Sequence, residues 1–339
     1  MLLVEKQKIN GLIRLLAKNM PVYIPGRREQ NGAVESVFEK FEEGAELDFE
    51  YLPTLLSVKE FFLPPKEDIF VFNEKKDAVS AAPKPKPFII FGLNSRDLEA
   101  LVQLDEIMTK PNPDYFYLQK RATATIVGLI NEPVKIPLNG DLILAKINEE
   151  QYEAIPLTDK GKNLTKNKIF KNEVGIITSA GPKSAELEIM PRLRKLLYDP
   201  ELISDAISWS WRNDPGVWDE LEALCLGCGI CTYVCPLCYC FSIEDSVGLD
   251  EKECKRCRQW DACTLPKFSR ISGGFNFHKT IRERYYNWYF HKFVRAYKEY
   301  GKSQCVACGR CQKYCPAKID IEKYIVRIVN NYKNAFNLN

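Results

Sequence analysis

The order of hydrophobic and polar residues predicts a strand, a helix and a second strand in the first part of the chain. FIIFGL at 88 to 93 is a short apolar run typical of a buried strand. SRDLEALVQLDEIM at 95 to 108 keeps a helical apolar period and opens with Ser95 as a predicted N-cap. The β-branched stretch ATATIVGLI at 122 to 130 predicts the second strand. We therefore expect a mixed α/β domain over residues 1–220.

Other stretches of this first part predict shorter elements and argue against a signal peptide and a membrane-spanning segment. MLLVEKQKINGLIRLLAKNM (1–20) spreads charged residues through its apolar positions, which favours an amphipathic helix over a signal peptide. SVKEFFLPPKEDIFVF (57–72) is an apolar run, a Pro-Pro break and a strand-like alternation, and AAPKPKP (81–87) predicts an extended proline-rich spacer. No apolar stretch is long enough to span a membrane, and the sequence has no glycine-rich nucleotide loop.

The last third of the chain has a helical hydrophobic period and carries every cysteine. FHKTIRERYYNWYFHKFVRAYKEY (277–300) and IDIEKYIVRIVNNY (319–332) both predict helices. All 13 cysteines lie between Cys225 and Cys315. We therefore expect residues 221–339 to form an α-helical ferredoxin-type domain, which makes the fold class of the whole chain α+β.

One motif occurs twice in this part of the chain. CLGCGICTYVCP (225–236) and CVACGRCQKYCP (305–316) both read CxxCGxCxxxCP. Three cysteines at this spacing hold one 4Fe-4S cluster, while the fourth, just before proline, is a ligand of the other cluster. The pattern therefore predicts two 4Fe-4S clusters, with cluster 1 held by Cys225, Cys228, Cys231 and Cys315 and cluster 2 by Cys305, Cys308, Cys311 and Cys235.

Zinc is the alternative metal, because paired CxxC units also form zinc ribbons and fingers. Zinc sites use two such pairs and need no third cysteine with a following CP in both copies, so the motif favours iron and sulfur. Five cysteines remain, and they leave open a third site for an iron–sulfur cluster or zinc. Its candidate ligands are Cys238, Cys240, Cys254, Cys257 and Cys263. Buried structural thiols, or ligands exchanged into the first two clusters, are the other interpretations.

Charge and redox chemistry indicate where such a protein would work. Clustered cysteines in odd number favour metal binding in a reducing compartment, so we expect a cytoplasmic protein.

Residues 221–339 have 19 Lys and Arg against 11 Asp and Glu, a net charge of +8, whereas residues 1–220 have a net charge of −5. Such a basic part could bind nucleic acid, but thiolate clusters are anionic and basic side chains can offset their charge. We therefore expect no nucleic-acid partner.

Neither histidine is predicted to be catalytic. His278 and His291 are the only histidines of the chain, and we expect each to pack or hydrogen-bond near a cluster. The sequence offers no nucleophile with an adjacent base, so no catalytic residue is predicted. The arginines Arg282, Arg284 and Arg295 are candidates to neutralise cluster charge or to contact an acidic partner.

Several stretches together resemble a known family. The CxxCGxCTxVCPxCxCF block (225–241), WDAC (260–263), GGFNFHKTIRERYYNWYFHKF (273–293) and the second cysteine motif are similar to the β subunit of cytosolic sulfhydrogenases and the related A subunit of anaerobic sulfite reductases. Upstream, the order of the family's N-terminal domain is matched by VKEFFLPPKEDIFVF (58–72), IIFGLNSRDLEALVQLDEIM (89–108) and DYFYLQKRATATIVGL (114–129). The resemblance covers most of the chain.

Two departures from the family pattern bear on metal binding. Family members often have a cysteine where this chain has Arg96, just before Asp97. A cysteine-rich patch can also follow the predicted strand 122–130 in the family, but none follows Leu129 in this chain. A metal site in the N-terminal part is therefore not expected. The extra pair Cys254 and Cys257 keeps the third site open.

The resemblance implies an electron-transfer subunit of an anaerobic oxidoreductase. Such a subunit relays electrons between a flavin subunit that handles NAD(P)H and a catalytic partner of the hydrogenase or sulfite reductase type. One alternative is an enzyme that reduces sulfur or disulfides at a third metal site formed by the surplus cysteines. The other is a zinc-dependent nucleic-acid-binding protein, which only the basic charge favours.

Overall fold

The computed structural model describes residues 1–30, 32–51, 53–73, 78–81, 84–131, 139–172, 189–248 and 253–338. The predicted spacer 81–87 falls partly outside these ranges. The contacts divide the chain into two compact units. Unit 1 comprises Met1–Phe62 and Pro85–Ile189, and unit 2 comprises Leu63–Lys84 and Met190–Asn339.

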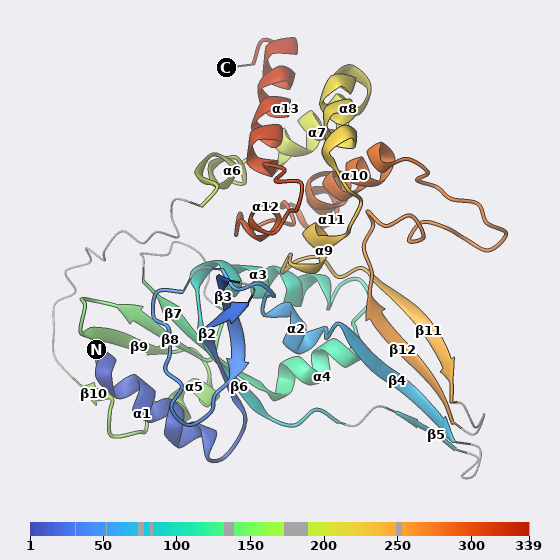
Figure 1. Cartoon of the computed structure of the whole chain (residues 1–339). Coiled ribbons are helices and arrows are strands. Elements are labelled where there is room, and N and C mark those ends of the chain that lie inside the picture. Colours follow the sequence, from blue (N-terminus) through green and yellow to red (C-terminus); the bar gives the residue numbers. More distant parts are fainter. Residues whose placement is uncertain are drawn as a thin grey trace. The chain divides into compact units, whose positions relative to one another are not determined.

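Unit 1 is built on an eight-stranded mixed sheet of described strands in the order β10-β1-β9-β8-β7-β6-β2-β3 (Figure 1). The four strands β2, β6, β7 and β8 pair in parallel, and the remaining pairs are antiparallel. The strands are β1 (Leu2–Glu5), β2 (Val22–Gln30), β3 (Ala33–Lys40), β6 (Phe88–Leu93), β7 (Ala124–Ile130), β8 (Leu142–Lys146), β9 (Gln151–Pro156) and β10 (Lys171–Asn172).

The predicted strand, helix and strand form the centre of unit 1. The apolar run of β6 is buried at Ile89, Ile90 and Phe91, as expected of a central parallel strand covered on both faces. Helix α3 (Ser95–Ile107) follows, and its N-cap is Asn94 rather than the predicted Ser95, because the Asn94 side chain accepts from the backbone N–H of Asp97 at 2.8 Å. The other helices of the unit are α1 (Lys6–Ala17), α2 (Lys59–Phe62), α4 (Tyr115–Thr123) and α5 (Asp159–Leu164).

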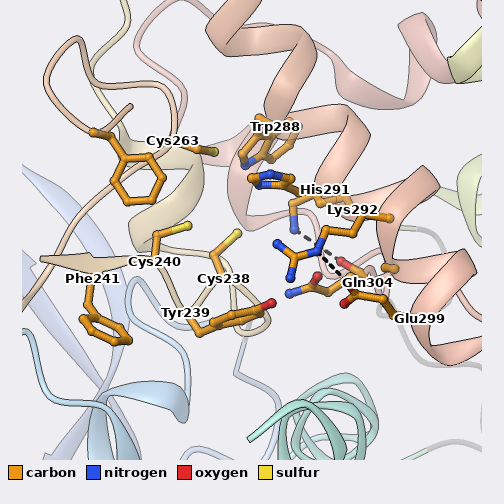
Figure 2. Close-up of a pocket in the computed structure, with 13 residues that line it drawn as sticks. Cys238, Tyr239, Cys240, Phe241, Cys263, Trp288, His291, Lys292, Glu299 and Gln304 are labelled. Carbon is orange, nitrogen blue, oxygen red and sulfur yellow. Dashed lines mark hydrogen bonds and ion pairs between the residues drawn. The ribbon is translucent and has the colours of Figure 1, made fainter. Parts of the chain in front are cut away.

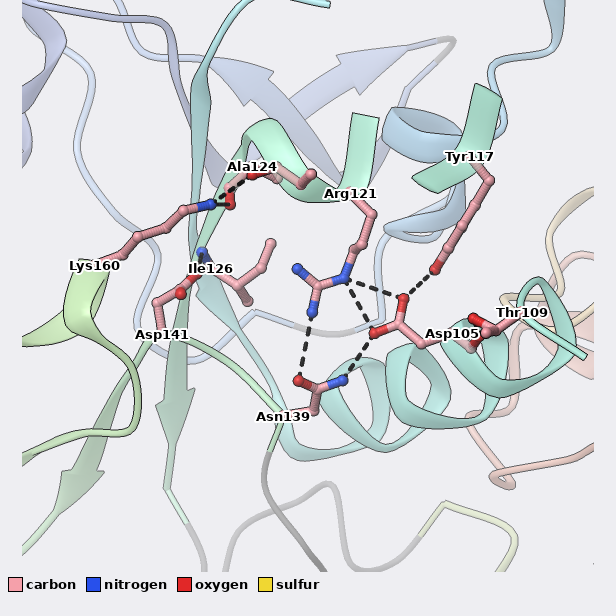
Figure 3. Close-up of polar contacts among 10 residues, drawn as sticks. Asp105, Thr109, Tyr117, Arg121, Ala124, Ile126, Asn139, Asp141 and Lys160 are labelled. Atoms are coloured by element: carbon pink, nitrogen blue, oxygen red, sulfur yellow. Dashed lines mark hydrogen bonds and ion pairs between the residues drawn. The ribbon is translucent and has the colours of Figure 1, made fainter. Parts of the chain in front are cut away.

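A polar network fastens α3 and α4 together (Figure 3). The Asp105 carboxylate accepts from the Tyr117 hydroxyl at 2.5 Å, from Arg121 Nε at 3.1 Å and from Asn139 Nδ2 at 2.9 Å. Burial and the neighbouring Asp105 raise the pKa of Tyr117 far above its usual range, so its hydroxyl keeps its proton and stays a donor.

A second set of polar contacts lies at the start of β7 and β8. Asp141 accepts from the Ile126 backbone N–H at 2.8 Å, and Lys160 Nζ donates to the carbonyl oxygens of Ala122 and Ala124 at 2.8 and 2.7 Å. These contacts lie at the amino ends of the parallel strands, whereas α/β sheets bind ligands at the carboxyl ends (Figure 3). We therefore interpret both networks as structural.

Unit 2 contains a four-stranded antiparallel sheet in the order β11-β12-β4-β5. The strands β4 (Lys66–Asn73) and β5 (Ala78–Ala81) come from the first part of the sequence, while β11 (Phe241–Val247) and β12 (Glu253–Trp260) follow the first cysteine motif. The Trp260 indole N–H donates to the Leu63 carbonyl at 2.8 Å. The hairpin β4–β5 thus completes a sheet of the cysteine-bearing unit.

Most of the rest of unit 2 is helical (Figure 1). Its helices are α6 (Pro191–Leu196), α7 (Pro200–Asn213), α8 (Pro215–Leu224), α9 (Ile230–Tyr233), α10 (Ile281–Tyr289), α11 (Ala296–Tyr300), α12 (Arg310–Lys313) and α13 (Ile321–Ala335), with the π-helix η3 (Phe290–Arg295) between α10 and α11. Helix α13 packs on α6 and α7. Glu322 accepts from the Leu193 backbone N–H at 2.9 Å, and Tyr324 donates to Glu220 at 2.6 Å.

The α+β fold class predicted from the sequence is confirmed, but the contacts divide the chain elsewhere than at residue 220. Helices α6 to α8 belong to the cysteine-bearing unit because their side chains pack on α13 and α10. The hairpin β4–β5 joins that unit because β4 pairs with β12. None of the helices in the described ranges is long and apolar enough to cross a membrane.

Candidate metal centre

The two cysteine motifs fold into equivalent loops. Gly229 and Gly309 have φ angles of +80° and +77°, a conformation in which glycine carries no Cβ penalty, and each begins a one-turn helix. Two residues earlier, Gly227 and Ala307 also have positive φ, and each donates its N–H at 3.4 Å to the sulfur of the cysteine two positions before it, Cys225 or Cys305. The short helices α9 and α12 pack against each other. The repeat in sequence is thus a repeat in structure.

The four cysteines predicted for cluster 1 line one cavity. They are Cys225, Cys228, Cys231 and Cys315, and the cavity has a volume of about 30 Å³. Cys228 is exposed and the other three are half-buried. The backbone N–H of Ile319 donates to Cys315 Sγ at 3.4 Å. The structure therefore brings a cysteine of the second motif to the three of the first.

The four cysteines predicted for cluster 2 line a second cavity. They are Cys305, Cys308, Cys311 and Cys235, around a volume of about 20 Å³. Cys235 and Cys308 are buried. The backbone N–H of Leu237 donates to Cys235 Sγ at 3.4 Å. Here the first motif supplies the fourth thiol to the second, as the CP spacing predicts.

The two cavities are adjacent. Trp288, Cys311 and Ile321 line both of them. Trp288 is only 1% exposed and stacks at 5.7 Å on Tyr285, which is also buried. The indole therefore forms a dry wall shared by both sets of thiols.

Each set of thiols has a buried cation beside it. Lys292 is 3% exposed, and its ammonium donates to Cys235 Sγ at 3.0 Å and to the Gln304 carbonyl at 3.3 Å. Arg284 is 6% exposed, donates to the Thr264 and Lys279 carbonyls at 3.0 and 2.8 Å, and acts electrostatically on Cys225. Burial by itself lowers the pKa of Lys292, but the nearby thiols outweigh it and raise this pKa well above its usual range.

Most of these thiols are hard to ionise without a metal. Burial raises the pKa of Cys231 and of Cys305 to about 12. Cys235 differs, because hydrogen bonds from Cys238 and Lys292 lower its pKa well below the usual range despite its burial. Since the thiolate is the metal ligand, assembly of a metal centre must release protons from these groups.

The number of thiols in each set and the hydrogen bonds to their sulfurs suit an iron–sulfur cluster. In the described parts of the chain, no three His, Cys, Asp or Glu side chains converge closely enough to bind one metal ion. Each set of four thiols instead surrounds a void, and backbone N–H groups point at several of the sulfurs. Thiolate ligands with hydrogen-bonded sulfurs around a shared void are what a 4Fe-4S cluster requires.

The five surplus cysteines fall into two groups. Cys238, Cys240 and Cys263 line a third cavity of about 290 Å³, where Figure 2 shows their thiols facing the same space. Cys254 and Cys257 lie on strand β12 and do not line this cavity. The thiol of Cys257 is instead hydrogen-bonded to Asp68 Oδ1 at 3.1 Å. All thirteen cysteines are within the described residues, and none forms a disulfide bond.

Of the histidines and arginines considered from the sequence, one histidine lines the third cavity and two arginines form ion pairs. His291 lines the third cavity, and burial lowers its pKa to about 4, so that the ring is neutral at pH 7 (Figure 2). His278 is half-buried in the segment before α10. Arg282 pairs with Asp219 at 2.5 Å, and Arg295 pairs with Glu299 at 2.7 Å.

Sequence reasoning missed two residues of the site, Trp288 and Lys292. Trp288 lines all three cavities, and Lys292 lines the second and the third. A signal was present, because Lys292 lies four residues after Trp288 and seven after Tyr285, on a helical face that carries aromatic residues. A lysine on such a face needs a buried anionic partner.

The comparisons with known proteins agree with the site. Residues 224–319 match the family model of a 4Fe-4S dicluster domain. The chain is 27% identical over 299 residues to sulfhydrogenase 2 subunit beta of Pyrococcus furiosus, and the alignment covers 85% of this chain and 87% of the relative. No solved structure matches the chain. The resemblance to sulfhydrogenase β subunits is therefore confirmed, and the match of residues 224–319 to a 4Fe-4S dicluster domain supports iron–sulfur clusters in this part of the chain.

Proposed function

We propose that the chain is an electron-relay subunit of a cytoplasmic oxidoreductase with several subunits. It would pass electrons between a flavin subunit that handles NAD(P)H and a catalytic subunit of the hydrogenase or sulfite reductase type. The observation that carries the proposal is the pair of adjacent cavities, each lined by the four cysteines that the repeated motif assigns to it. The match to a sulfhydrogenase β subunit supports the kind of complex.

The residues of the site suit electron transfer without substrate chemistry. When bound, a 4Fe-4S cluster supplies one-electron chemistry whose potential depends on charge, hydrogen bonds to sulfur and exposure. Four thiols in each cavity would give every iron a cysteine ligand, which leaves no iron of these two sites for substrate. Lys292 and Arg284 offset the negative charge of the thiolates, and Trp288 excludes water between them.

The basic charge of the last third is consistent with this role. Lys292 and Arg284 are buried beside cysteine sulfur or a cysteine loop, and Arg282 and Arg256 form ion pairs with Asp219 and Asp245. These basic side chains therefore have protein partners. A nucleic-acid interface is not needed to explain them.

Electrons would enter or leave through the edge of the first cysteine cavity. Cys228 is the exposed member of its set, and the neighbouring Leu226 is 66% exposed although it lines the same cavity. In the second set, Cys235 and Cys308 are buried. A redox partner that covers Leu226 would therefore lie closest to the first set of thiols.

Anaerobic reduction of the purified chain tests the relay. NAD(P)H alone is expected to leave the visible spectrum unchanged, whereas NAD(P)H with the flavin subunit should bleach it and a viologen dye should then restore it. Iron–sulfur clusters take up single electrons, so hydride from NAD(P)H is expected to reach them only through the flavin. Bleaching by NAD(P)H alone would overturn the assignment.

A sulfur- or disulfide-reducing enzyme is the second candidate function. The observation in its favour is the third cavity, where three cysteines outside the repeated motif face a space of about 290 Å³. Supplied with excess reduced viologen as the electron donor, the chain without partner subunits would then reduce polysulfide or a small disulfide over many turnovers, faster than the donor does alone, whereas a relay subunit would not increase that rate.

A further inference from the structure

We propose that Cys238, Cys240 and Cys263 hold a third iron–sulfur cluster of the 4Fe-4S class, whose fourth iron has no cysteine ligand. The repeated motif accounts for eight of the thirteen cysteines, and these three are among the five that remain. The inference goes beyond the relay of two clusters and does not depend on which partner subunits the chain has.

The three thiols line one cavity although Cys263 lies far along the chain from Cys238 and Cys240. Cys238 and Cys240 lie in the segment between α9 and β11, and Cys263 follows β12. Figure 2 shows all three facing the same space. Cys238 and Cys263 are 8% and 2% exposed. Buried thiols from two segments that converge on one void are typical of a ligand set.

The cavity has room for a cluster. Its volume is about 290 Å³. Liquid water occupies roughly 30 Å³ per molecule, so this cavity would otherwise hold several waters against Trp288 and Phe268, which are largely apolar. A bulky inorganic group bound by the thiols fills that space.

A single zinc ion fits the same residues poorly. In the described ranges no three Cys, His, Asp or Glu side chains are close enough to ligate one ion. Zinc in a structural site needs four such ligands at 2.0 to 2.3 Å. Three thiols that line one cavity could instead bind three irons of a 4Fe-4S cluster. Without a cluster, Cys263 is hydrogen-bonded to Cys240 and Cys238 to Cys235, and a bound cluster would replace these thiol contacts.

The position of the cavity gives such a cluster neighbours for electron exchange. Trp288 lines this cavity and both motif cavities, and Lys292 lines this one and the second. Cys238 is hydrogen-bonded to Cys235, a predicted ligand of cluster 2. A third cluster would thus lie directly beside the other two.

Iron and acid-labile sulfide in four versions of the full chain, purified anaerobically, test the proposal. We expect about twelve irons per chain in the wild type, and about eight in both Cys240→Ser and Cys263→Ser. Cys254→Ser is the matched control, because Cys254 is also a surplus cysteine but lies on β12 outside the cavity. It is expected to keep about twelve.

The outcomes separate this proposal from the relay. About eight irons in the wild type, or the same count in wild type and both cavity variants, would overturn the third cluster and leave the two-cluster relay intact. An oxidisable thiol pair at Cys240 and Cys263 would give that result. If Cys263→Ser misfolds and contains fewer than about eight irons per chain, the iron content of Cys240→Ser alone decides whether the third cluster exists. A wild type with four irons or none would instead defeat the relay.

Discussion

At the scale of single residues, the charge of Lys292 is expected to set the potential of the second cluster. Its ammonium lies 3.0 Å from Cys235 Sγ and is 3% exposed, so water screens it little. A positive charge and a hydrogen bond to a cysteine sulfur favour the reduced, more negative cluster.

Lys292→Met is therefore expected to lower the reduction potential of cluster 2. If the variant loses about 1.4 kcal/mol of the stabilisation that Lys292 gives the reduced cluster over the oxidised one, the one-electron potential falls by about 59 mV. An anaerobic redox titration followed by electron paramagnetic resonance measures the shift. Lys292→Arg, which keeps the charge, is the control, and an unchanged potential in Lys292→Met would contradict the argument.

Single residues also show how far sequence reasoning reached. The eight motif cysteines could be grouped from the sequence because their spacing is a local pattern, and the structure places each group around one cavity. The surplus cysteines could not be divided in this way. Whether Cys263 or Cys257 faces the third cavity depends on where β12 ends and how it pairs, which spacing does not encode.

At the scale of elements, α10 and η3 carry the side chains that join the three cavities. The helix changes to π-helical at Phe290, and the π segment contains both His291 and Lys292. π-Helical turns occur frequently at functional sites because the extra residue redirects side chains. The hydrophobic period predicted a helix over 277–300, but it could not show this local change of pitch.

The start of α10 depends on a capping box. Thr280 Oγ1 accepts from the Glu283 backbone N–H at 3.1 Å, and the Thr280 N–H donates to the Glu283 carboxylate at 2.9 Å. The backbone hydrogen bond from Thr280 lowers the pKa of Glu283. Its stabilising effect is therefore present at neutral pH and is lost as the pH falls through this lowered pKa.

Thr280→Ala should destabilise unit 2 by about 1 kcal/mol through loss of this cap. The expected result is a lower denaturant midpoint for loss of the visible cluster absorption, with the metal content of the native protein unchanged. Thr280→Ser keeps the hydroxyl and should behave as the wild type. Equal midpoints for the alanine and serine variants would contradict the proposed role of the cap.

At the scale of the whole molecule, the sequence predicted the elements better than their assembly. The strand at 88–93, the following helix and the helix at 319–332 could be predicted because hydrophobic period is local. The sheet that joins β4 to β12 could not, since it pairs residues such as Phe72 and Cys254 from distant parts of the chain. The placement of β4–β5 and of α6 to α8 in unit 2 follows from these long-range contacts.

The charge division between the two parts of the chain has a structural explanation. The excess of Lys and Arg in residues 221–339 includes the two cations buried beside the thiols, Lys292 and Arg284. Bound clusters would add negative charge inside unit 2 and bring its net charge closer to zero. Lys292 and Arg284 would then offset part of that negative charge.

Iron, acid-labile sulfide and zinc per chain in anaerobically purified wild-type protein test the central claim most directly. The account predicts equal iron and sulfide, at about eight per chain from the two motif sites and about twelve with the third cavity filled, and no stoichiometric zinc. Zinc without iron, or about four irons, would contradict the two-cluster relay.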